Sequence, residues 1–407
     1  MAVPFWYTGW IMAFDYVLHK GTRSRAVLQS VTPAQAEAAQ KFHSGIEGYT
    51  ATPLVNLPAW AQKIGVRKIW VKDESKRFGL NAFKALGGSY AIARYLCAKL
   101  GIPVDENAFN ILRSEEARQK LGQITFVTAT DGNHGRGVAW AAKLLGHKAV
   151  VYLPEGSSLE RLNNIRALGA EAEITKFNYD SAVRLAYAMS KKHGWVMVQD
   201  TAWPGYEEIP TWIMQGYTTM AQEIAAQLSG EVPTHLFLQA GVGSMAGAVL
   251  GYFAALWGGK TPVTVICEPD KASCLYKTAA ANDGQIHKVG GKMDSMMAGL
   301  CCGEPCTVSW DIIDNFASAF VACSDEYAAR GMCLLGKTAA GDARVVSGES
   351  GAVTAGVLDA IMTEAQLAPL REALGLNENS RVLLISTEGD TDKVNYLKVL
   401  AGKWQQK

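Results

Sequence analysis

Short β-branched segments alternate with longer amphipathic segments from about residue 68 onward, and this alternation limits the possible folds more than any other feature. The strand-like segments read KIWVKDE, ITFVTAT, KAVVYLP, AEAEITKF, WVMVQDT, THLFLQA, VTVICEP and RVLLISTEGD. Between them lie segments such as RGVAWAAKLLG and YDSAVRLAYAMSKKHG, in which apolar residues recur every three or four positions and a glycine stands near the end. The pattern predicts βαβ units, and therefore an α/β fold in which helices cover mostly parallel sheets.

Four loops that follow predicted strands carry unusual combinations of residues. They read SKRFGLNAFK, TATDGNHGRG, QAGVGSMAG and STEGDTD. In open parallel sheets, ligands bind at the carboxyl ends of the strands, so we expect the functional site to be built from these loops. No Pro-, Gly- or Ser-rich linker divides the chain into halves, and we therefore expect domains that are joined by several chain crossings.

The charge balance and the hydropathy argue against two classes of partner. The chain of 407 residues has 39 Lys and Arg against 38 Asp and Glu, without a basic block, so neither nucleic acid nor an anionic membrane surface is indicated. No window approaches the roughly 20 consecutive apolar residues of a membrane-spanning helix. The apolar opening VPFWYTGWIMAF follows no basic segment, so we expect a packed N-terminal segment rather than a signal peptide. A small-molecule substrate is the better expectation.

The cysteines do not have the spacing of an extracellular disulfide framework, and a reducing cytoplasm fits them best. The eight are Cys97, Cys267, Cys274, Cys301, Cys302, Cys306, Cys323 and Cys333. The run CCGEPC has the short spacing of half a zinc site, but no second pair and no nearby histidine accompanies it, so we expect buried thiols and no metal. A pairing such as Cys274 with Cys302 stays open, because sequence alone cannot establish it.

Lys84 stands between Phe83 and Ala85 in the run NAFKALGGSY, among small and apolar residues. Loss of solvation lowers the pKa of such an ammonium towards the range in which the free amine acts as a nucleophile. Lysines of this kind form Schiff bases. Alternatively, the aliphatic stem of Lys84 packs on the core while its charged head reaches water, which is common for lysines on amphipathic helices.

The loop Thr130-Asp131-Gly132-Asn133-His134-Gly135 follows one predicted strand and precedes a predicted helix. Its glycines let the backbone approach a ligand closely, and the helix start presents free N–H groups, so an anionic group fits there. Alternatively, the loop is a glycine-rich turn in which an Asp or Asn side chain caps the helix. We expect His134 of this loop to be a hydrogen-bonded structural residue rather than a metal ligand.

A second glycine-rich loop, at residues 241–247, follows the strand-like segment THLFLQA. Its consecutive N–H groups, with a helix dipole behind them, would form an anion-binding concavity that suits a phosphate. The loop also imitates a dinucleotide-binding fingerprint, and Glu268 closes the next strand roughly where the ribose-binding acid would lie. The third glycine comes one place too late for that fingerprint, but a nicotinamide-dependent dehydrogenase remains a rival interpretation.

A candidate nucleophilic lysine, a small polar loop and a downstream phosphate loop together match the parts of a pyridoxal phosphate site. The motifs TATPL, KDES with NAFK, DGNHG and AGVGSMAG resemble, in content and order, those of the fold type II pyridoxal-phosphate enzymes. That resemblance implies two open, mostly parallel twisted sheets with helices on both faces. It also implies a large cofactor-binding domain from residues 1–88 and 202–407, with an N-terminal extension at 1–35, and a smaller inserted α/β domain at 89–201.

Longer motifs narrow the resemblance to the diaminopropionate ammonia-lyase family. VKDESKRFGLNAFK, TDGNHGRGVAWAA, QDTAWPGYEEIPTWIMQGY, SGESGAV and STEGDTD are similar to that family's motifs, and the likeness runs from about residue 40 to the C-terminus. It implies a cytoplasmic homodimer that eliminates ammonia from D- and L-2,3-diaminopropionate, giving pyruvate and two ammonia. The first 35 or so residues match nothing that can be placed.

The resemblance also implies a role for each matching residue. Lys84 would hold pyridoxal phosphate, and Asp131 and Asp200 would act as acid/base groups from opposite faces of the substrate. The phosphate would lie on Gly241, Val242, Gly243, Ser244 and Met245, the ring hydroxyl near Asn133, and the pyridine nitrogen near Thr387 or Ser386. Thr130, Asp131, Gly132 and His134 would contact the substrate. Asp200 could equally be a helix cap or an ion-pair partner.

Three alternatives stay open beside this interpretation. A related pyridoxal-phosphate lyase, dehydratase or racemase would act on serine or threonine. A nicotinamide-dependent dehydrogenase would use the loop at residues 241–247 with Glu268 and would give Lys84 no special role. A degenerate member of the fold would bind ligands without turnover, although the lysine, both aspartates and the phosphate loop are all present.

Overall fold

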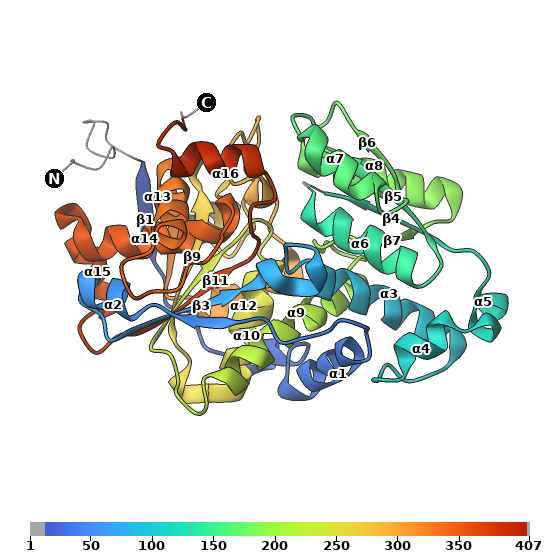
Figure 1. The fold of residues 1–407 in the computed structure, drawn as a ribbon, viewed down its shortest axis with the longest axis horizontal. Coiled ribbons are helices and arrows are strands. Elements are labelled where there is room, and N and C mark those ends of the chain that lie inside the picture. Colours follow the sequence, from blue (N-terminus) through green and yellow to red (C-terminus); the bar gives the residue numbers. More distant parts are fainter. Residues whose placement is uncertain (1–12, 131, 405–407) are drawn as a thin grey trace.

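The computed structural model describes residues 13–130 and 132–404. Most of the apolar N-terminal segment expected to pack on the protein, and Asp131, lie outside the described residues. Figure 1 shows the larger body, which contains the first and last described residues, beside a smaller body formed by the middle of the sequence.

Seven of the described strands form the larger sheet, in the order β1-β10-β9-β8-β11-β3-β2. Their bounds are β1 Phe14–Leu18, β2 Leu54–Asn56, β3 Lys68–Asp73, β8 His235–Gln239, β9 Val263–Pro269, β10 Ala319–Cys323 and β11 Arg381–Ser386. The five inner strands are parallel, and the two edge strands β1 and β2 are antiparallel to their neighbours. The carboxyl ends of the inner strands therefore meet along one edge.

The smaller sheet has four strands in the described part of the chain, in the order β6-β5-β4-β7, and all are parallel. They are β4 Thr125–Ala129, β5 Lys148–Leu153, β6 Glu171–Ile174 and β7 Val196–Met197. Every one of these strands lies within residues 89–201, the segment that we expect to form the inserted domain. The position of the domain boundary itself stays a prediction.

Helices cover both faces of both sheets (Figure 1). The longer ones are α1 Pro33–Ser44, α3 Ala85–Leu100, α6 Asn133–Leu144, α8 Tyr179–His193, α9 Glu208–Gln227, α10 Ser244–Trp257, α12 Thr307–Phe316, α13 Asp325–Gly336 and α14 Glu349–Thr363. The shorter ones are α2 Pro58–Ile64, α4 Ala108–Arg113, α5 Glu115–Leu121, α7 Leu159–Arg166, α11 Cys274–Ala281, α15 Ala368–Leu374 and α16 Lys393–Leu400. A 3₁₀ segment, η2 Glu74–Gly79, leads towards Lys84.

Successive residues of the inner strands alternate between two hydrophobic cores. In β11, Leu383 and Ile385 pack with α1, α3, α9 and α10, whereas Val382 and Leu384 pack with α2, α13, α14 and α15. This division follows from the two-residue period of a strand. Because both faces are buried, the strands are almost continuously apolar, as parallel sheets require.

The alternating pattern of the sequence is confirmed by the structure, but it misses three strands. Each of the eight strand-like segments contains a described strand, although WVMVQDT contributes only the two residues of β7. β1, β2 and β10 were not predicted. β1 and β2 are short edge strands, of five and three residues, and β1 pairs with a strand some 300 residues later. β10 follows α12 after only two residues, so no separate turn marks its start.

Small residues after Lys84 let three helices cross closely. A Cβ atom added to Gly87 on α3 would lie 2.5 Å from the ring of Tyr217 on α9, and one added to Gly137 on α6 would lie 3.0 Å from the Ala85 backbone. Larger side chains would push α9 and α6 away from α3. The GG pair of the sequence therefore fixes the start of α3, and Lys84 with it, against both bodies.

Candidate active site

One pocket lies between the two sheets and gathers residues from the predicted loops. It is lined by Phe83, Lys84, Asn133, Tyr179, Asp200, Gln239, Ala240, Gly241, Val242, Gly243, Ser244, Met245, Ala246, Gly299, Leu300, Cys302, Ser350, Thr387 and Glu388. Most of the residues that we expect to bind the cofactor or act on the substrate are in this set. The loops converge here because they follow strand ends that face one another.

Lys84 and Asp200 form an ion pair in this pocket. The Nζ atom of Lys84, at the start of α3, donates to Oδ2 of Asp200, which follows β7 of the smaller sheet. The side chain of Lys84 is 17% exposed and that of Asp200 only 4%. The hydroxyl of Tyr179 donates to the other oxygen of Asp200, at 3.1 Å. Neither the lysine nor the aspartate is therefore an isolated surface group.

The surroundings of Asp200 keep its carboxylate ionised. Burial alone would raise its pKa, but the nearby imidazole of His134 and the ammonium of Lys84, with hydrogen bonds from Lys84 and Tyr179, hold the pKa well below its ordinary range. Nδ1 of His134 lies 3.8 Å from Oδ2 of Asp200. A carboxylate that is charged at neutral pH beside a lysine amine can hold or accept a proton.

The loop at residues 241–247 offers a cradle of backbone N–H groups. No described backbone carbonyl accepts from the N–H groups of residues 241–246, although all six residues are buried. The first turn of α10 begins here, and Gly243 before it has a φ of +98°, which favours glycine. Buried donors at a helix start without protein acceptors fit an anion such as phosphate.

The end of β11 presents a hydrogen-bonded chain of polar side chains. Nε2 of Gln239 donates to Oγ1 of Thr387 at 3.0 Å, and that hydroxyl donates to Oε2 of Glu388 at 2.7 Å. The N–H of Gly351 donates to the other oxygen of Glu388, at 2.7 Å. The hydroxyl of Ser386 turns away and donates to Ser347 Oγ at 2.8 Å. Thr387 thus lines the pocket, and Ser386 does not.

The polar loop of the smaller body contributes Asn133 to the pocket, while its neighbours stabilise the loop. Oγ1 of Thr130 accepts from the N–H groups of Gly132 and Gly135, at 2.9 and 3.0 Å. Nε2 of His134 donates to the Val198 carbonyl at 2.8 Å. Thr130, Gly132 and His134 are therefore beside the pocket rather than in its lining, and Asp131 lies outside the described residues.

Several residues of the pocket carry no signal in the sequence analysis. Tyr179 opens a helix in the smaller body, and Gln239 ends β8. Ser350 and Glu388 lie within the quoted motifs SGESGAV and STEGDTD, but their roles were not assigned. The position of Gln239 at the end of a central strand is the one local signal that could have identified it.

A fully buried network of charges supports the segment that precedes Lys84. Glu223 on α9 pairs with Lys72 of β3 and with Arg77 of η2, each at 2.7 Å, and Arg77 also pairs with Glu74 at 2.8 Å. All four side chains are 0% exposed. Burial disfavours each charge, and the mutual pairing offsets that cost. The network joins β3, η2 and α9 just before Lys84 in the chain.

Glu268 caps the start of a helix and is not positioned to bind the ribose of a nicotinamide cofactor. It is buried, and its carboxylate accepts from the N–H groups of Leu275 and Tyr276 at the start of α11, at 2.9 and 2.6 Å. Burial raises its pKa to about 8. Glu268 is absent from the lining of the pocket, so it does not stand beside the glycine loop as a ribose-binding acid would.

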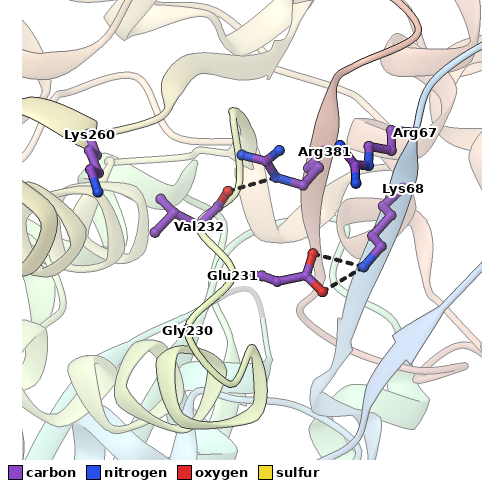
Figure 2. Close-up of a pocket in the computed structure, with 7 residues that line it drawn as sticks. All are labelled: Arg67, Lys68, Gly230, Glu231, Val232, Lys260 and Arg381. Atoms are coloured by element: carbon purple, nitrogen blue, oxygen red, sulfur yellow. Dashed lines mark hydrogen bonds and ion pairs between the residues drawn. The ribbon is translucent and has the colours of Figure 1, made fainter.

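A larger cavity, of about 550 Å³, lies away from this chemistry, at the amino ends of β3 and β11 (Figure 2). Lys68 bonds both oxygens of Glu231 there, at 2.6 and 2.8 Å, and Nε of Arg381 donates to the Val232 carbonyl (Figure 2). Ligands of parallel sheets bind at the opposite ends of the strands. The smaller pocket with Lys84 and Asp200 is therefore the candidate active site.

The structure gives no sign of a metal centre or of a disulfide in its described part. No group of three His, Cys, Asp or Glu side chains there is arranged to hold a metal ion. No disulfide joins any of the eight cysteines in the described part of the chain, so Cys274 and Cys302 are not bonded to each other. No described helix is both long and apolar enough to span a bilayer.

Known proteins place this fold and pocket in one family. The family described as pyridoxal-phosphate dependent enzymes matches residues 46–388. The diaminopropionate ammonia-lyase of Escherichia coli (strain K12) is 51% identical over 377 residues, which cover 92% of this chain and 92% of that protein. The Salmonella typhimurium (strain LT2) protein of the same name is 52% identical over 354 residues, 86% of this chain and 88% of that protein. This chain belongs to the pyridoxal-phosphate-dependent enzymes, in the group of the diaminopropionate ammonia-lyases.

Solved structures agree with that placement. The Escherichia coli diaminopropionate ammonia-lyase in complex with an aminoacrylate-PLP azomethine intermediate has a TM-score of 0.87 and 47% identity, over 96% of this chain and 98% of that chain. Threonine deaminase isoform 2 from Solanum lycopersicum, at 18% identity and a TM-score of 0.72, covers 95% of this chain and 97% of that one and shows the shared fold alone. The predicted fold type II architecture and the predicted cofactor are thereby confirmed.

Proposed function

We propose that this chain catalyses the α,β-elimination of D- and L-2,3-diaminopropionate to pyruvate and two ammonia, with pyridoxal phosphate as cofactor. The relatives named above support the substrate. The observation that carries the proposal is the ion pair of Lys84 with the buried Asp200 inside a pocket that also holds a glycine-rich cradle of free N–H groups.

The residues of the pocket fit the cofactor. The phosphate would accept from the N–H groups of residues 241–245, which have no other acceptor among the described backbone carbonyls. Lys84 would bind the aldehyde carbon, Asn133 would lie near the ring hydroxyl, and Thr387 near the ring nitrogen. When bound, pyridoxal phosphate delocalises the electron pair that remains at Cα after a proton is removed.

The protein's own groups would then move the protons. Asp200 is ionised and lies in the pocket, so it would accept the Cα proton of one enantiomer. Asp131, which adjoins Gly132 in the sequence, would accept the Cα proton of the other enantiomer. Lys84 would donate a proton to the departing β-amino group, so that it leaves as ammonia rather than as a poor anionic leaving group.

Electrostatics favours a diamino acid over serine in this pocket. A carboxylate near the distal ammonium of 2,3-diaminopropionate stabilises that substrate, whereas the neutral hydroxyl of serine gains no such ion pair. The Escherichia coli relative has nevertheless been solved in complex with D-serine. A lyase that acts on serine is therefore the second candidate, and relative activity on the two substrates separates the two.

The proposal extends to the domains, the oligomeric state and the location of the protein. Residues 1–88 and 202–407 would form the cofactor-binding domain and residues 89–201 the inserted one, because the strands divide between the sheets in that way. A homodimer is the expectation from the family. Cysteines that form no disulfide suit the reducing conditions of the cytoplasm.

The test is pyruvate formation by the purified protein with pyridoxal phosphate, compared for D-diaminopropionate, L-diaminopropionate, D-serine and L-serine. The proposal expects kcat/KM to be highest for the diamino acids. Higher kcat/KM values for serine would indicate that the chain is a lyase that acts on serine. If the protein showed the visible absorption band of bound pyridoxal phosphate but formed no pyruvate from any of the four amino acids, the cofactor assignment would stand and the substrate assignment would be rejected.

A further inference from the structure

A separate concave site, of about 220 Å³, lies on the far side of the segment that leads to Lys84. Its walls are apolar and aromatic, and come from Ile46, Phe78, Phe109, Trp140 and Leu144. These side chains belong to four different parts of the chain: the end of α1, η2, α4 and α6. None of them lines the pocket that contains Lys84 and Asp200.

Two opposite charges complete this site. Glu47 and Arg113 line it, both are exposed, and neither forms an ion pair with another described residue. The guanidinium of Arg113 lies over the ring of Phe109, 5.3 Å from its centroid. An acid and a base above an apolar floor match the ammonium, the carboxylate and the apolar side chain of an α-amino acid.

We propose that this site, which we call the Phe78 site, binds an α-amino acid with an apolar or aromatic side chain as an effector. Its volume is below the roughly 300–1,000 Å³ of pockets for drug-sized ligands, so it suits a single amino acid rather than a nucleotide. Arg113 would bind the carboxylate and Glu47 the ammonium.

The Phe78 site contacts both segments that build the reaction pocket. Phe78 has a φ of +49°, a conformation that residues other than glycine rarely adopt, and it precedes Lys84 by only a few positions in the chain. Its ring contacts that of Trp140 in a tilted arrangement, with centroids 4.8 Å apart and an interplanar angle of 35°. Trp140 belongs to α6, the helix that begins at Asn133 in the pocket. A ligand on both rings therefore restrains the approach to Lys84 and the polar loop together.

The test uses the holoenzyme and a ligand that cannot react with the cofactor. N,N-dimethyl-L-phenylalanine retains both charges and the aromatic ring, but its tertiary amine cannot condense with an aldehyde, so binding at Lys84 is avoided. Calorimetric titration should give saturable binding. Arg113→Gln and Glu47→Gln should each weaken it by about tenfold, because each removes a charged hydrogen bond. Arg118→Gln, an exposed arginine outside the site, is the matched control and should bind as the wild type does.

Each result decides the proposal. 3-Phenylpropanoate, which lacks the ammonium, should bind more weakly than N,N-dimethyl-L-phenylalanine. Occupancy should change KM or kcat for the elimination in the wild type and not in Arg113→Gln. Absence of saturable binding, equal binding by the wild type and both rim variants, or loss of binding in saturating substrate would overturn the site. Binding without any kinetic change would overturn its role as an effector site. Calorimetry measures binding directly, so the test of the Phe78 site does not require that the chain acts on diaminopropionate.

Discussion

Asp200 accepts a hydrogen bond from the ammonium of Lys84, although the two residues are 116 positions apart and follow strands of different sheets. Lys84 lies at the start of α3 after the larger sheet's β3, whereas Asp200 follows β7 of the smaller sheet. The pair therefore forms only when the two bodies meet. It gives the chain an ionised carboxylate beside the amine that would hold the cofactor.

Replacement of Lys84 by alanine should abolish turnover, by about a thousandfold or more, and remove the visible band of the bound cofactor. The fold should persist, because the Lys84 side chain is partly exposed and Asp200 keeps its hydrogen bond from Tyr179. Absorbance, circular dichroism and pyruvate release measure the three effects. Lys76→Ala, an exposed lysine on the same approach segment, should behave as the wild type does. Pyruvate production at wild-type rates by Lys84→Ala would reject the proposed role of Lys84.

Asp200→Asn and Asp131→Asn should impair the two enantiomers of diaminopropionate unequally and in opposite order. Asparagine retains the shape of each side chain but cannot accept a proton, and loss of a general base costs about 10²–10⁴ in rate. Steady-state kinetics with the pure D and L substrates give the comparison. If each variant lost the same factor on both enantiomers, two bases on opposite faces would not describe the site.

Glu223→Gln should destabilise the protein by about 3–5 kcal/mol, because it leaves Lys72 and Arg77 buried without their shared carboxylate. Ionic and hydrogen-bond contacts with Arg77 and Lys72 hold the pKa of Glu223 low, at about 2, against the opposing effect of burial. Urea denaturation monitored by circular dichroism measures the change. Glu116→Gln removes an exposed i,i+4 pair with Lys120 and should leave the denaturation midpoint nearly unchanged. A midpoint for Glu223→Gln equal to that of the control would show that the buried network contributes little.

Acidification below about pH 6.5 should lower the free energy of unfolding, in part through His43. Burial, with the charge of Arg77, lowers the pKa of His43 to about 3, so the unfolded chain binds a proton that the folded chain does not. Stability from this group is present above the unfolded pKa and is lost as pH falls towards 3, at about 1.4 kcal/mol per pH unit. The contacts agree: Nε2 donates to the Leu86 carbonyl at 3.0 Å, and Nδ1 accepts from Thr219 Oγ1 at 2.8 Å.

Denaturation curves recorded from pH 7 to pH 4 test this for the wild type and for His43→Gln, which should have a shallower dependence on pH. His193→Gln, at an exposed histidine, is the matched control and should follow the wild type. Identical pH slopes for His43→Gln and the wild type would mean that His43 carries none of the acid sensitivity.

The elements with strong local patterns could be predicted from the chain alone. β3, β8, β9 and β11 are short runs of mostly apolar residues, and α8 has a clear amphipathic period, so their type follows from residue order. β1 could not be predicted, because it is a strand only through its antiparallel pairing with β10, some 300 residues later.

Some residues of the candidate site could likewise be predicted from local patterns in the sequence, and others could not. Lys84, Asn133 and the loop at residues 241–245 could be selected from the sequence, because glycines and a lysine among apolar residues are local signals. Tyr179 and Glu388 could not, since an ordinary helix start and one of several acidic residues become significant only when they face the pocket. Ser386 and Thr387 are adjacent in the sequence, but Ser386 ends β11 and bonds to Ser347, whereas Thr387 follows the strand and lines the pocket.

The sequence by itself determined the α/β class, the order of the loops and the chemical groups available for binding a phosphate and an aldehyde. Only the tertiary structure decided which of those groups meet. Periodicity describes the faces of each element, whereas the contact of Lys84 with Asp200 depends on how a second sheet packs against the first, and on close helix crossings at glycines such as Gly87. Those contacts are between residues far apart in the chain, so no local pattern records them.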